Sequence, residues 1–348
     1  MYLNANSELD IDWGDGGSHS TFTTTSAGYQ SERHNYSTAG DYVIAITVTT
    51  GSFVLQSSST NNVSSILWNG NNNGNSPDKA YNNAIKKIEI GTGVSIIGNN
   101  AFYACYSLTS IAIPDSVTSI GQSAFQNCYS LTSITIPDSV TANIDQYVFR
   151  YCYSLSSISI PDGVTSIDNQ TFYNCYALTS ITIPDTVTII GSETFDGCYS
   201  LSSITIPDSV TFIGSNSFQY CYASSSITLP DGITSISNYT FSNCYALTSI
   251  TIPDTVTGIG SYSFSYCYSL SSITIPNKVT IIGSYAFQYC SFMESIKFTS
   301  TKPPTVANSN AWLGVPTTCK IYVPTGTLNA YKTATNYPNP NTYTYIEY

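Results

Sequence analysis

Charged side chains are scarce in this sequence, and basic ones are the scarcest. Only 9% of the 348 residues are charged, and ten Lys and Arg residues stand against 21 Asp and Glu residues, so the formal net charge is −11. A chain without a basic cluster is poorly suited to neutralise rows of phosphates, which argues against nucleic acid and anionic membranes as partners. The polar surface must therefore consist mainly of Ser, Thr, Asn and Tyr.

Long apolar runs and the usual catalytic motifs are also missing. No stretch of 18 or more apolar residues occurs, so the sequence predicts no transmembrane segment. The first residues, Met1 to Asn4, lack the basic and apolar regions of a signal peptide. His19 and His34 are the only histidines, and no GxSxG, HExxH or P-loop pattern is found. We therefore expect no enzymatic activity and no cofactor. Either the protein is cytosolic or its signal peptide is absent from this sequence, and the hydroxyl-rich, Lys-poor composition favours the second, an extracellular or cell-surface protein.

The sequence is dominated instead by a repeat of 23 residues. A Cys recurs at this interval, except for one interval of 24 residues where the segment containing Ala142 and Asn143 is longer by one. A Phe precedes each of these Cys residues by three positions, and nine units run from residue 85 to 292. The repeated cysteines are Cys105, Cys128, Cys152, Cys175, Cys198, Cys221, Cys244, Cys267 and Cys290.

Each unit contains two patterns of apolar residues. Ile134 and Ile136 alternate with polar residues, which predicts a half-buried strand. Phe125, Cys128 and Leu131 recur every three residues, which predicts a short helical turn. We therefore expect each unit to form a strand, a corner and a short helical arm that returns along the opposite side. Stacking of the units then forms a parallel sheet.

The pattern L-x-x-I-x-I-P-x-x-V-x-x-I-G-x-x-A-F-x-x-C resembles the BspA-like leucine-rich repeat family over residues 85 to 292. The resemblance implies an α/β solenoid, a right-handed leucine-rich repeat superhelix with a parallel sheet on its concave face. It also implies a surface protein of the kind used by host-associated bacteria and some parasitic protists in adhesion to host or matrix proteins. Some units depart from the pattern: Leu is replaced by Ser224, Gly by Asp145, Asp168 and Ser237, and Asp by Asn277. We expect these departures to loosen single turns.

The residues on either side of the array do not follow the repeat. Residues 1–68 contain W-G-D-G at 13–16 and H-x-Y-x-x-A-G-x-Y from His34, which resemble a polycystic-kidney-disease-type immunoglobulin-like domain. This resemblance implies a small N-terminal all-β sandwich. We expect residues 69–84 to form a linker and an N-terminal cap, because Asn and Gly dominate their first half. Residues 293–348 predict a C-terminal repeat and cap, with two strands and a short helix.

Pairs of hydroxyl residues flank the central Ile of the predicted strands. If the Ile points inward, these residues lie on the exposed concave face. A generic soluble surface, a hydroxyl-rich groove for a protein or glycan, and a match to ice are the three interpretations, of which a curved sheet fits ice poorly. The candidate binding residues are Ser133, Thr135, Ser157, Ser159, Ser180, Thr182, Ser203, Thr205, Ser226, Thr228, Ser249, Thr251, Ser272 and Thr274.

Three further rows follow from the repeat. The Cys row predicts a reduced, buried structural ladder rather than disulfides or a metal site, because parallel side chains rarely meet disulfide geometry. The Asp row after each Pro, from Asp115 to Asp254, favours local Asx turns over a weak cation-binding stripe. The Tyr row after each Cys, from Tyr106 to Tyr268, favours packing between units over a platform for sugars or proteins.

These patterns together predict a monomeric, secreted or surface-displayed binding protein whose partner is a protein or a glycan. A structural spacer that presents another domain is the alternative. Because most units are nearly identical, we expect specificity where they differ: at Ala142 and Asn143, around Ser224, and at the two ends.

Overall fold

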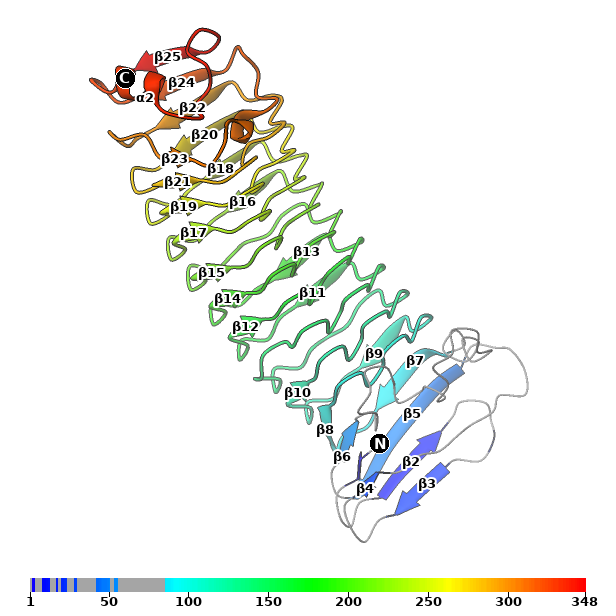
Figure 1. The fold of residues 1–348 in the computed structure, drawn as a ribbon. Coiled ribbons are helices and arrows are strands. Elements are labelled where there is room, and N and C mark those ends of the chain that lie inside the picture. Colours follow the sequence, from blue (N-terminus) through cyan, green and yellow to red (C-terminus); the bar gives the residue numbers. More distant parts are fainter. Residues whose placement is uncertain are drawn as a thin grey trace. The chain divides into compact units, whose positions relative to one another are not determined.

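The computed structural model describes residues 2–3, 8–12, 17, 20–23, 28–29, 42–50, 53–55 and 85–348. These residues belong to two compact units, Met1–Pro184 and Asp185–Tyr348. Within each unit, short parallel strands of successive turns pair in ladders, with one or two strands in most turns (Figure 1). Each unit is therefore a stretch of parallel-strand solenoid.

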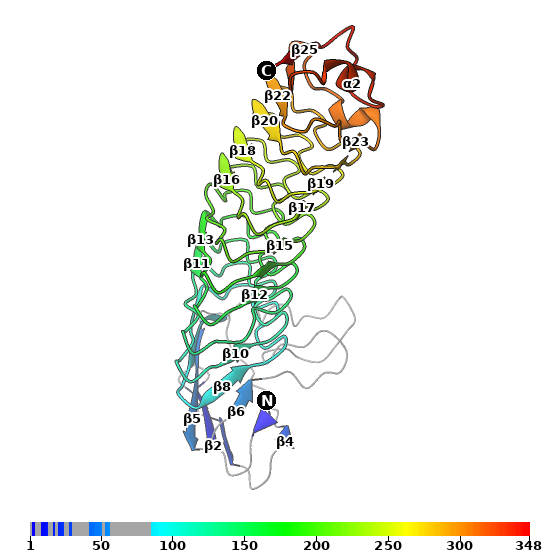
Figure 2. The same cartoon turned by 90° about the vertical axis from the view of Figure 1, so that its left-hand side faces the viewer.

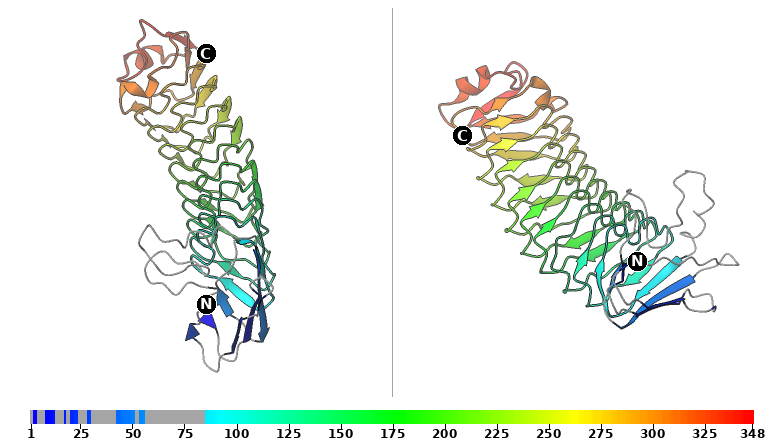
Figure 3. Two further views of the ribbon diagram at one scale, coloured as in Figure 1. Left: turned by 90° about the vertical axis from the view of Figure 1, so that its right-hand side faces the viewer. Right: turned by 60° about the horizontal axis from the view of Figure 1, so that its bottom comes forward.

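In the first unit, two five-stranded sheets have the orders β3-β2-β5-β7-β9 and β10-β8-β6-β1-β4. The N-terminal strands are β1 (Tyr2–Leu3), β2 (Glu8–Asp12), β3 (Ser20–Thr23), β4 (Gly28–Tyr29), β5 (Tyr42–Thr50) and β6 (Phe53–Leu55). The turns contain β7 (Ile85–Ile90), β8 (Val94–Ile97), β9 (Ser110–Ala112), β10 (Ser119–Ile120), β11 (Ser157–Ser159), β12 (Ser166–Ile167) and β13 (Ser180–Thr182). Because β5 pairs in parallel with β7 and β6 with β8, the N-terminal strands extend both sheets (Figure 3).

The predicted polycystic-kidney-disease-type domain is not tested by these strands. Its first sequence signature, at 13–16, and all but the last residue of its second, from His34 to Tyr42, lie outside the described residues. The predicted linker at 69–84 lies outside them as well. Both interpretations stay predictions.

The second unit continues the same construction to the C-terminus of the chain. Its strands β16, β18, β20 and β22 lie on one side of the stack and β17 and β19 on the other (Figure 2). The pairing advances by one repeat, so that Ser226 pairs with Ser249 and Gly258 with Ile281. The strands are β14 (Ile189–Ile190), β15 (Phe212–Ile213), β16 (Ser226–Thr228), β17 (Ser235–Ile236), β18 (Ser249–Thr251), β19 (Gly258–Ile259), β20 (Ser272–Ile275), β21 (Ile281–Ile282), β22 (Ser295–Phe298), β23 (Thr305–Val306), β24 (Lys320–Val323) and β25 (Thr344–Glu347).

Equivalent side chains of successive turns stack into ladders that form the core of each unit. The repeat Phe rings are fully buried, and neighbouring ring centres lie between 5.3 and 5.6 Å apart. In the second unit the last ring of the ladder, Phe287, stacks on Trp312 at 5.3 Å. Burial of one apolar residue at the same place in every turn makes the interior continuous within a unit.

The predicted helical arm is wrong, and the α/β class is not supported. The described residues contain one α-helix, α2 (Leu328–Thr333), and one 3₁₀ helix, η1 (Ser309–Trp312). Both follow the last regular turn. None of the helices in the described part of the chain has the length and apolar character needed to cross a membrane.

The backbone of the arm explains why no helix forms there. Each arm contains two residues in the left-handed region, as at Tyr262 (φ 58°) and Tyr266 (φ 61°), and such residues interrupt a helix. The arm amides bond to the next turn instead: the Phe264 N–H donates to the Ala286 carbonyl at 2.8 Å. The turns are therefore held together by hydrogen bonds between neighbours on the arm as well as on the strands.

Candidate binding surface

The hydroxyl residues that flank the central Ile lie on one exposed surface in each unit, which we call the strand face. The Ile between them points inward, as shown by Ile158 and Ile227, which are 6% and 3% exposed. In the first unit the exposed residues are Ser133, Thr135, Ser157, Ser159, Ser180 and Thr182. In the second unit they are Ser203, Thr205, Ser226, Thr228, Ser249, Thr251, Ser272 and Thr274.

The strand register places equivalent hydroxyls side by side. Ser157 pairs with Ser180, and Ser159 with Thr182. Neighbouring strands in a sheet lie about 4.8 Å apart, and alternate residues of a strand lie about 6.6 Å apart. Each unit therefore presents a grid of hydroxyls whose spacing is set by the backbone.

The hydroxyls of the strand face are available to a ligand, whereas those beside it are not. Among the described residues, no hydrogen bond to another protein group involves a strand-face hydroxyl. The residues just before the strands behave differently: the Thr248 hydroxyl donates to the Ser225 carbonyl at 3.2 Å, and the Ser271 hydroxyl to the Thr248 carbonyl at 3.3 Å. One row of hydroxyls thus links the turns, and the strand face keeps its donors and acceptors unused.

The repeat cysteines lie in the core and form no disulfide in the described part of the chain. Their thiols bond to the Phe carbonyl of the preceding turn, as from Cys128 to Phe102 at 3.3 Å and from Cys244 to Phe218 at 3.2 Å. Burial raises the pKa of the Cys244 thiol well above its ordinary value. Among the described residues, no three His, Cys, Asp or Glu side chains are grouped to hold a metal ion. The Cys row therefore packs in the core and links neighbouring turns.

The Tyr row after the Cys ladder stacks from turn to turn. In the first unit the rings of Tyr129 and Tyr153 lie 4.7 Å apart, and in the second unit those of Tyr222 and Tyr245 lie 4.5 Å apart. This geometry fits the predicted packing between neighbouring repeats. A second row, in which Tyr262 stacks on its neighbours in adjacent turns at 4.6 and 4.7 Å, was not singled out from the sequence because only some turns carry Tyr there.

The Asp row does not form the predicted Asx turns. The turn after each Pro is closed by the backbone, as where the Val117 N–H donates to the Pro114 carbonyl at 3.0 Å and the Val256 N–H to the Pro253 carbonyl at 3.0 Å. Because these amides are already bonded, they are not available to the carboxylates. The Asp side chains of the row are exposed and make no hydrogen bond within the described chain.

Short strands paired in parallel at the register of the repeat, around buried ladders of Phe and Cys, define a leucine-rich repeat solenoid. The family model of the BspA-type leucine-rich repeat region matches residues 77–202 and 188–312. The chain belongs to this family. The comparison with curated proteins gave no match.

Several solved structures are similar to this chain. A leucine-rich repeat protein from Bacteroides ovatus is 21% identical, with a TM-score of 0.54 over 90% of this chain and 97% of that one. A leucine-rich cell surface protein from Faecalibacterium prausnitzii is 26% identical, with a TM-score of 0.39 over 83% of this chain and 93% of that one. A leucine-rich repeat protein from T. pallidum is 28% identical, with a TM-score of 0.38 over 53% of this chain and 77% of that one. The Bacteroides structure supports the solenoid fold.

Proposed function

We propose that this chain is a secreted or cell-surface binding protein that uses the strand face in adhesion to a host or matrix protein or glycan. The observation that carries the proposal is the grid of hydroxyls with no protein partner. A hydroxyl can both donate and accept a hydrogen bond, so a regular grid of them matches the amides of a polypeptide or the hydroxyls of a glycan. Membership of the BspA-type family and the Lys-poor, hydroxyl-rich composition support a location outside the cell.

The chemistry of the strand face favours binding over catalysis. Its side chains are Ser and Thr, and no acid, base or nucleophile distinguishes one turn of the grid from the next. Uncharged hydroxyls also give little long-range attraction, so affinity depends on many short contacts made at once. An extended ligand that lies across several turns suits such a surface better than a small molecule does.

A matched pair of triple variants tests this proposal. The full chain is first screened on arrays of glycans and of extracellular-matrix proteins, and any ligand found is then titrated. Replacing Thr228, Thr251 and Thr274 by Val removes three strand-face hydroxyls but keeps the shape of the side chains. We expect this variant to lose at least about tenfold in affinity, since each net hydrogen bond contributes about 0.5–1.5 kcal/mol.

The control variant replaces Thr211, Thr257 and Thr280 by Val. These threonines are also exposed, but their hydroxyls donate to the carbonyls of the preceding turn, at 3.1 Å for Thr257 and 3.2 Å for Thr280. The control should bind the ligand as the unmodified protein does. Equal loss in both variants, or no ligand across both arrays, contradicts the proposal and favours a spacer that presents another domain.

A further inference from the structure

The 24-residue turn interrupts a backbone ladder in the first unit. In the turns before and after it, the amide that follows the buried Ile donates to the preceding turn: Gly121 to the Ile97 carbonyl at 2.7 Å, and Asp168 to the Ile144 carbonyl at 3.0 Å. Within the described chain, no such bond joins the Asp145 amide to the Ile120 carbonyl, and β10 pairs with β8 alone. The two turns are therefore not bonded at this corner, although their arms are: the Ser123 N–H donates to the Gln146 carbonyl at 3.0 Å.

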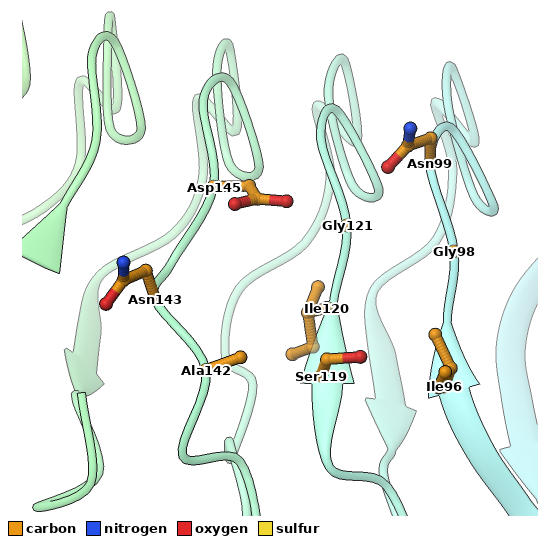
Figure 4. A pocket seen from close by; sticks show the side chains of 9 residues that line it. All are labelled: Ile96, Gly98, Asn99, Ser119, Ile120, Gly121, Ala142, Asn143 and Asp145. Atoms are coloured by element: carbon orange, nitrogen blue, oxygen red, sulfur yellow. The ribbon is translucent and has the colours of Figure 1, made fainter. Parts of the chain in front are cut away.

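A cavity of about 340 Å³ lies beside this corner (Figure 4). The carboxylate of Asp145 points from its own turn toward the turn that contains Gly121, as Figure 4 shows. The regular turn that contains Gly214 has no room for such a side chain, since a Cβ on Gly214 would lie 2.4 Å from the Ser192 backbone nitrogen. The residues that line the cavity include Ile96, Asn99, Ser119, Ala142, Asn143 and Asp145.

The cavity contains unused hydrogen-bond donors beside an acceptor. The Asp145 backbone N–H lacks its ladder bond, and the Asp145 carboxylate is half-buried. The Asn99 side-chain oxygen accepts a hydrogen bond from the Gln122 amide at 2.9 Å, and the NH₂ group of Asn99 has no partner in the described chain. Burial, and then the charge of Asp168, raise the pKa of Asp145, so its ionised form gains from any new hydrogen-bond donor.

This combination selects one class of ligand. An anion would be repelled by Asp145 and Asp168, and an ammonium group has no acceptor for the unpaired amide. A hydroxyl-bearing ligand suits both the carboxylate and the unpaired amide of Asp145, because each hydroxyl can donate to the carboxylate and accept from an N–H. Ile96 and Ala142 add apolar surface for the C–H face of a ring. We propose that this cavity binds one sugar residue, such as the terminal hexose of a glycan, through hydroxyls bonded to the carboxylate and the backbone amide of Asp145.

This site is separate from the strand face, and its test does not depend on a strand-face ligand. The full chain is titrated with D-glucose, D-galactose, D-mannose, L-fucose and N-acetyl-D-glucosamine, and binding is followed by saturation-transfer difference NMR. Deletion of Ala142 restores the 23-residue length, and Asp145→Gly restores the glycine that Gly121 and Gly214 provide in their turns. A third, Asp145→Asn, keeps the size of the side chain and removes its charge. Asp138→Asn is the control, because Asp138 is an exposed carboxylate that does not line the cavity.

We expect at least one sugar to bind the unmodified protein and the Asp138→Asn control with similar affinity. The Asp145 variants and the Ala142 deletion should weaken that binding by at least about tenfold, because hydrogen bonds to a charged group are among the stronger ones. Circular dichroism and thermal unfolding check that each variant is folded, and an unfolded variant leaves the decision to the others. The proposal is overturned if no sugar binds, if Asp145→Asn binds as well as the unmodified protein, or if methylammonium binds at this site and the sugars do not.

Discussion

At the scale of single residues, Asp196 stands out because it is an acid in the interior of the second unit. Its side chain is 7% exposed, whereas the equivalent residue is a neutral Gln or Ser in the four turns that follow. Burial, and then the charge of Glu193, raise the pKa of Asp196 to about 7. A buried carboxyl of this kind is protonated in acid and resists ionisation near neutral pH.

Asp196 should therefore make the unfolding free energy depend on pH. An unfolded Asp has a pKa of about 3.9, so between about pH 4 and 7 the unfolded chain releases this proton while the folded chain keeps it. The contribution of Asp196 to stability is fully present below about pH 4 and falls by up to about 1.4 kcal/mol per pH unit until the folded pKa is reached. Urea denaturation at pH 4.5, 5.5, 6.5 and 7.5 measures this slope.

The variant Asp196→Asn should flatten that slope and be more stable than the unmodified protein at pH 7.5. The exposed turn residue Asp208 provides the control, since Asp208→Asn should leave the slope unchanged. If Asp196→Asn and the unmodified protein show the same pH dependence, Asp196 does not titrate as its burial implies.

At the scale of the element, the corner after the second strand of a turn is governed by distance to the preceding turn. A Cβ on Gly283 would lie 2.4 Å from the Ser261 backbone nitrogen and 2.6 Å from the Gly260 carbonyl carbon. These are backbone atoms, so the preceding turn would have to shift to accommodate this Cβ. A Cβ on Gly258, in the neighbouring strand β19, would meet only a side-chain atom, the Cγ2 methyl of Ile281, at 3.2 Å.

Gly283→Ala should therefore destabilise the second unit by roughly 1–3 kcal/mol, the usual cost of overpacking a closely packed site. Gly258→Ala, the matched control, should change the free energy of unfolding by less than about 0.5 kcal/mol, as most surface substitutions do. Chemical denaturation of both variants under the same conditions makes the comparison. Similar losses at the two positions would show that the close approach of the turns is not what requires glycine at the corner.

At the scale of the whole molecule, the C-terminal residues cover the last regular turn. Phe298, Trp312, Tyr331 and Tyr337 form an aromatic cluster in which Phe298 and Tyr331 lie 5.0 Å apart. The Tyr331 hydroxyl also donates to the Ser300 carbonyl at 2.7 Å. The sheet itself is continued by β24, which pairs in parallel with β22, and then by β25, which pairs in parallel with β24.

Removal of residues 319–348 should expose the edge of β22 and half of this cluster. Open sheet edges pair with other chains, and solenoids need covered ends. We expect the shortened chain to form oligomers and to unfold at a temperature lower by about 5 °C or more. Size-exclusion chromatography with light scattering, together with thermal unfolding, checks this against the full chain at the same concentration. A shortened chain that stays monomeric and keeps its melting temperature would mean that these residues are not a cap.

Much of the fold could be predicted from the sequence because a fixed interval stacks equivalent residues. The 23-residue spacing of Cys and Phe indicates the ladders, and the alternation around Ile134 indicates which hydroxyls face outward. The arm was mispredicted because the three-residue spacing of Phe125 and Cys128 is shared by a helical turn and by the turns seen here. The difference lies in where the amides bond, and their partners belong to the next turn.

The cavity likewise combines one feature that the sequence shows with others that only the structure shows. The additional residue near Ala142 is visible in the sequence and marks the place where one turn differs from the rest. Asn99 and Ser119, which line the cavity with Asp145, come from two earlier turns and look ordinary in their own repeats. The sequence by itself therefore determined the repeat, the inward and outward faces of the strands and the family. Only the tertiary structure decided which backbone groups are left unpaired and which side chains meet, because both depend on the distance between neighbouring turns, and no single repeat contains that distance.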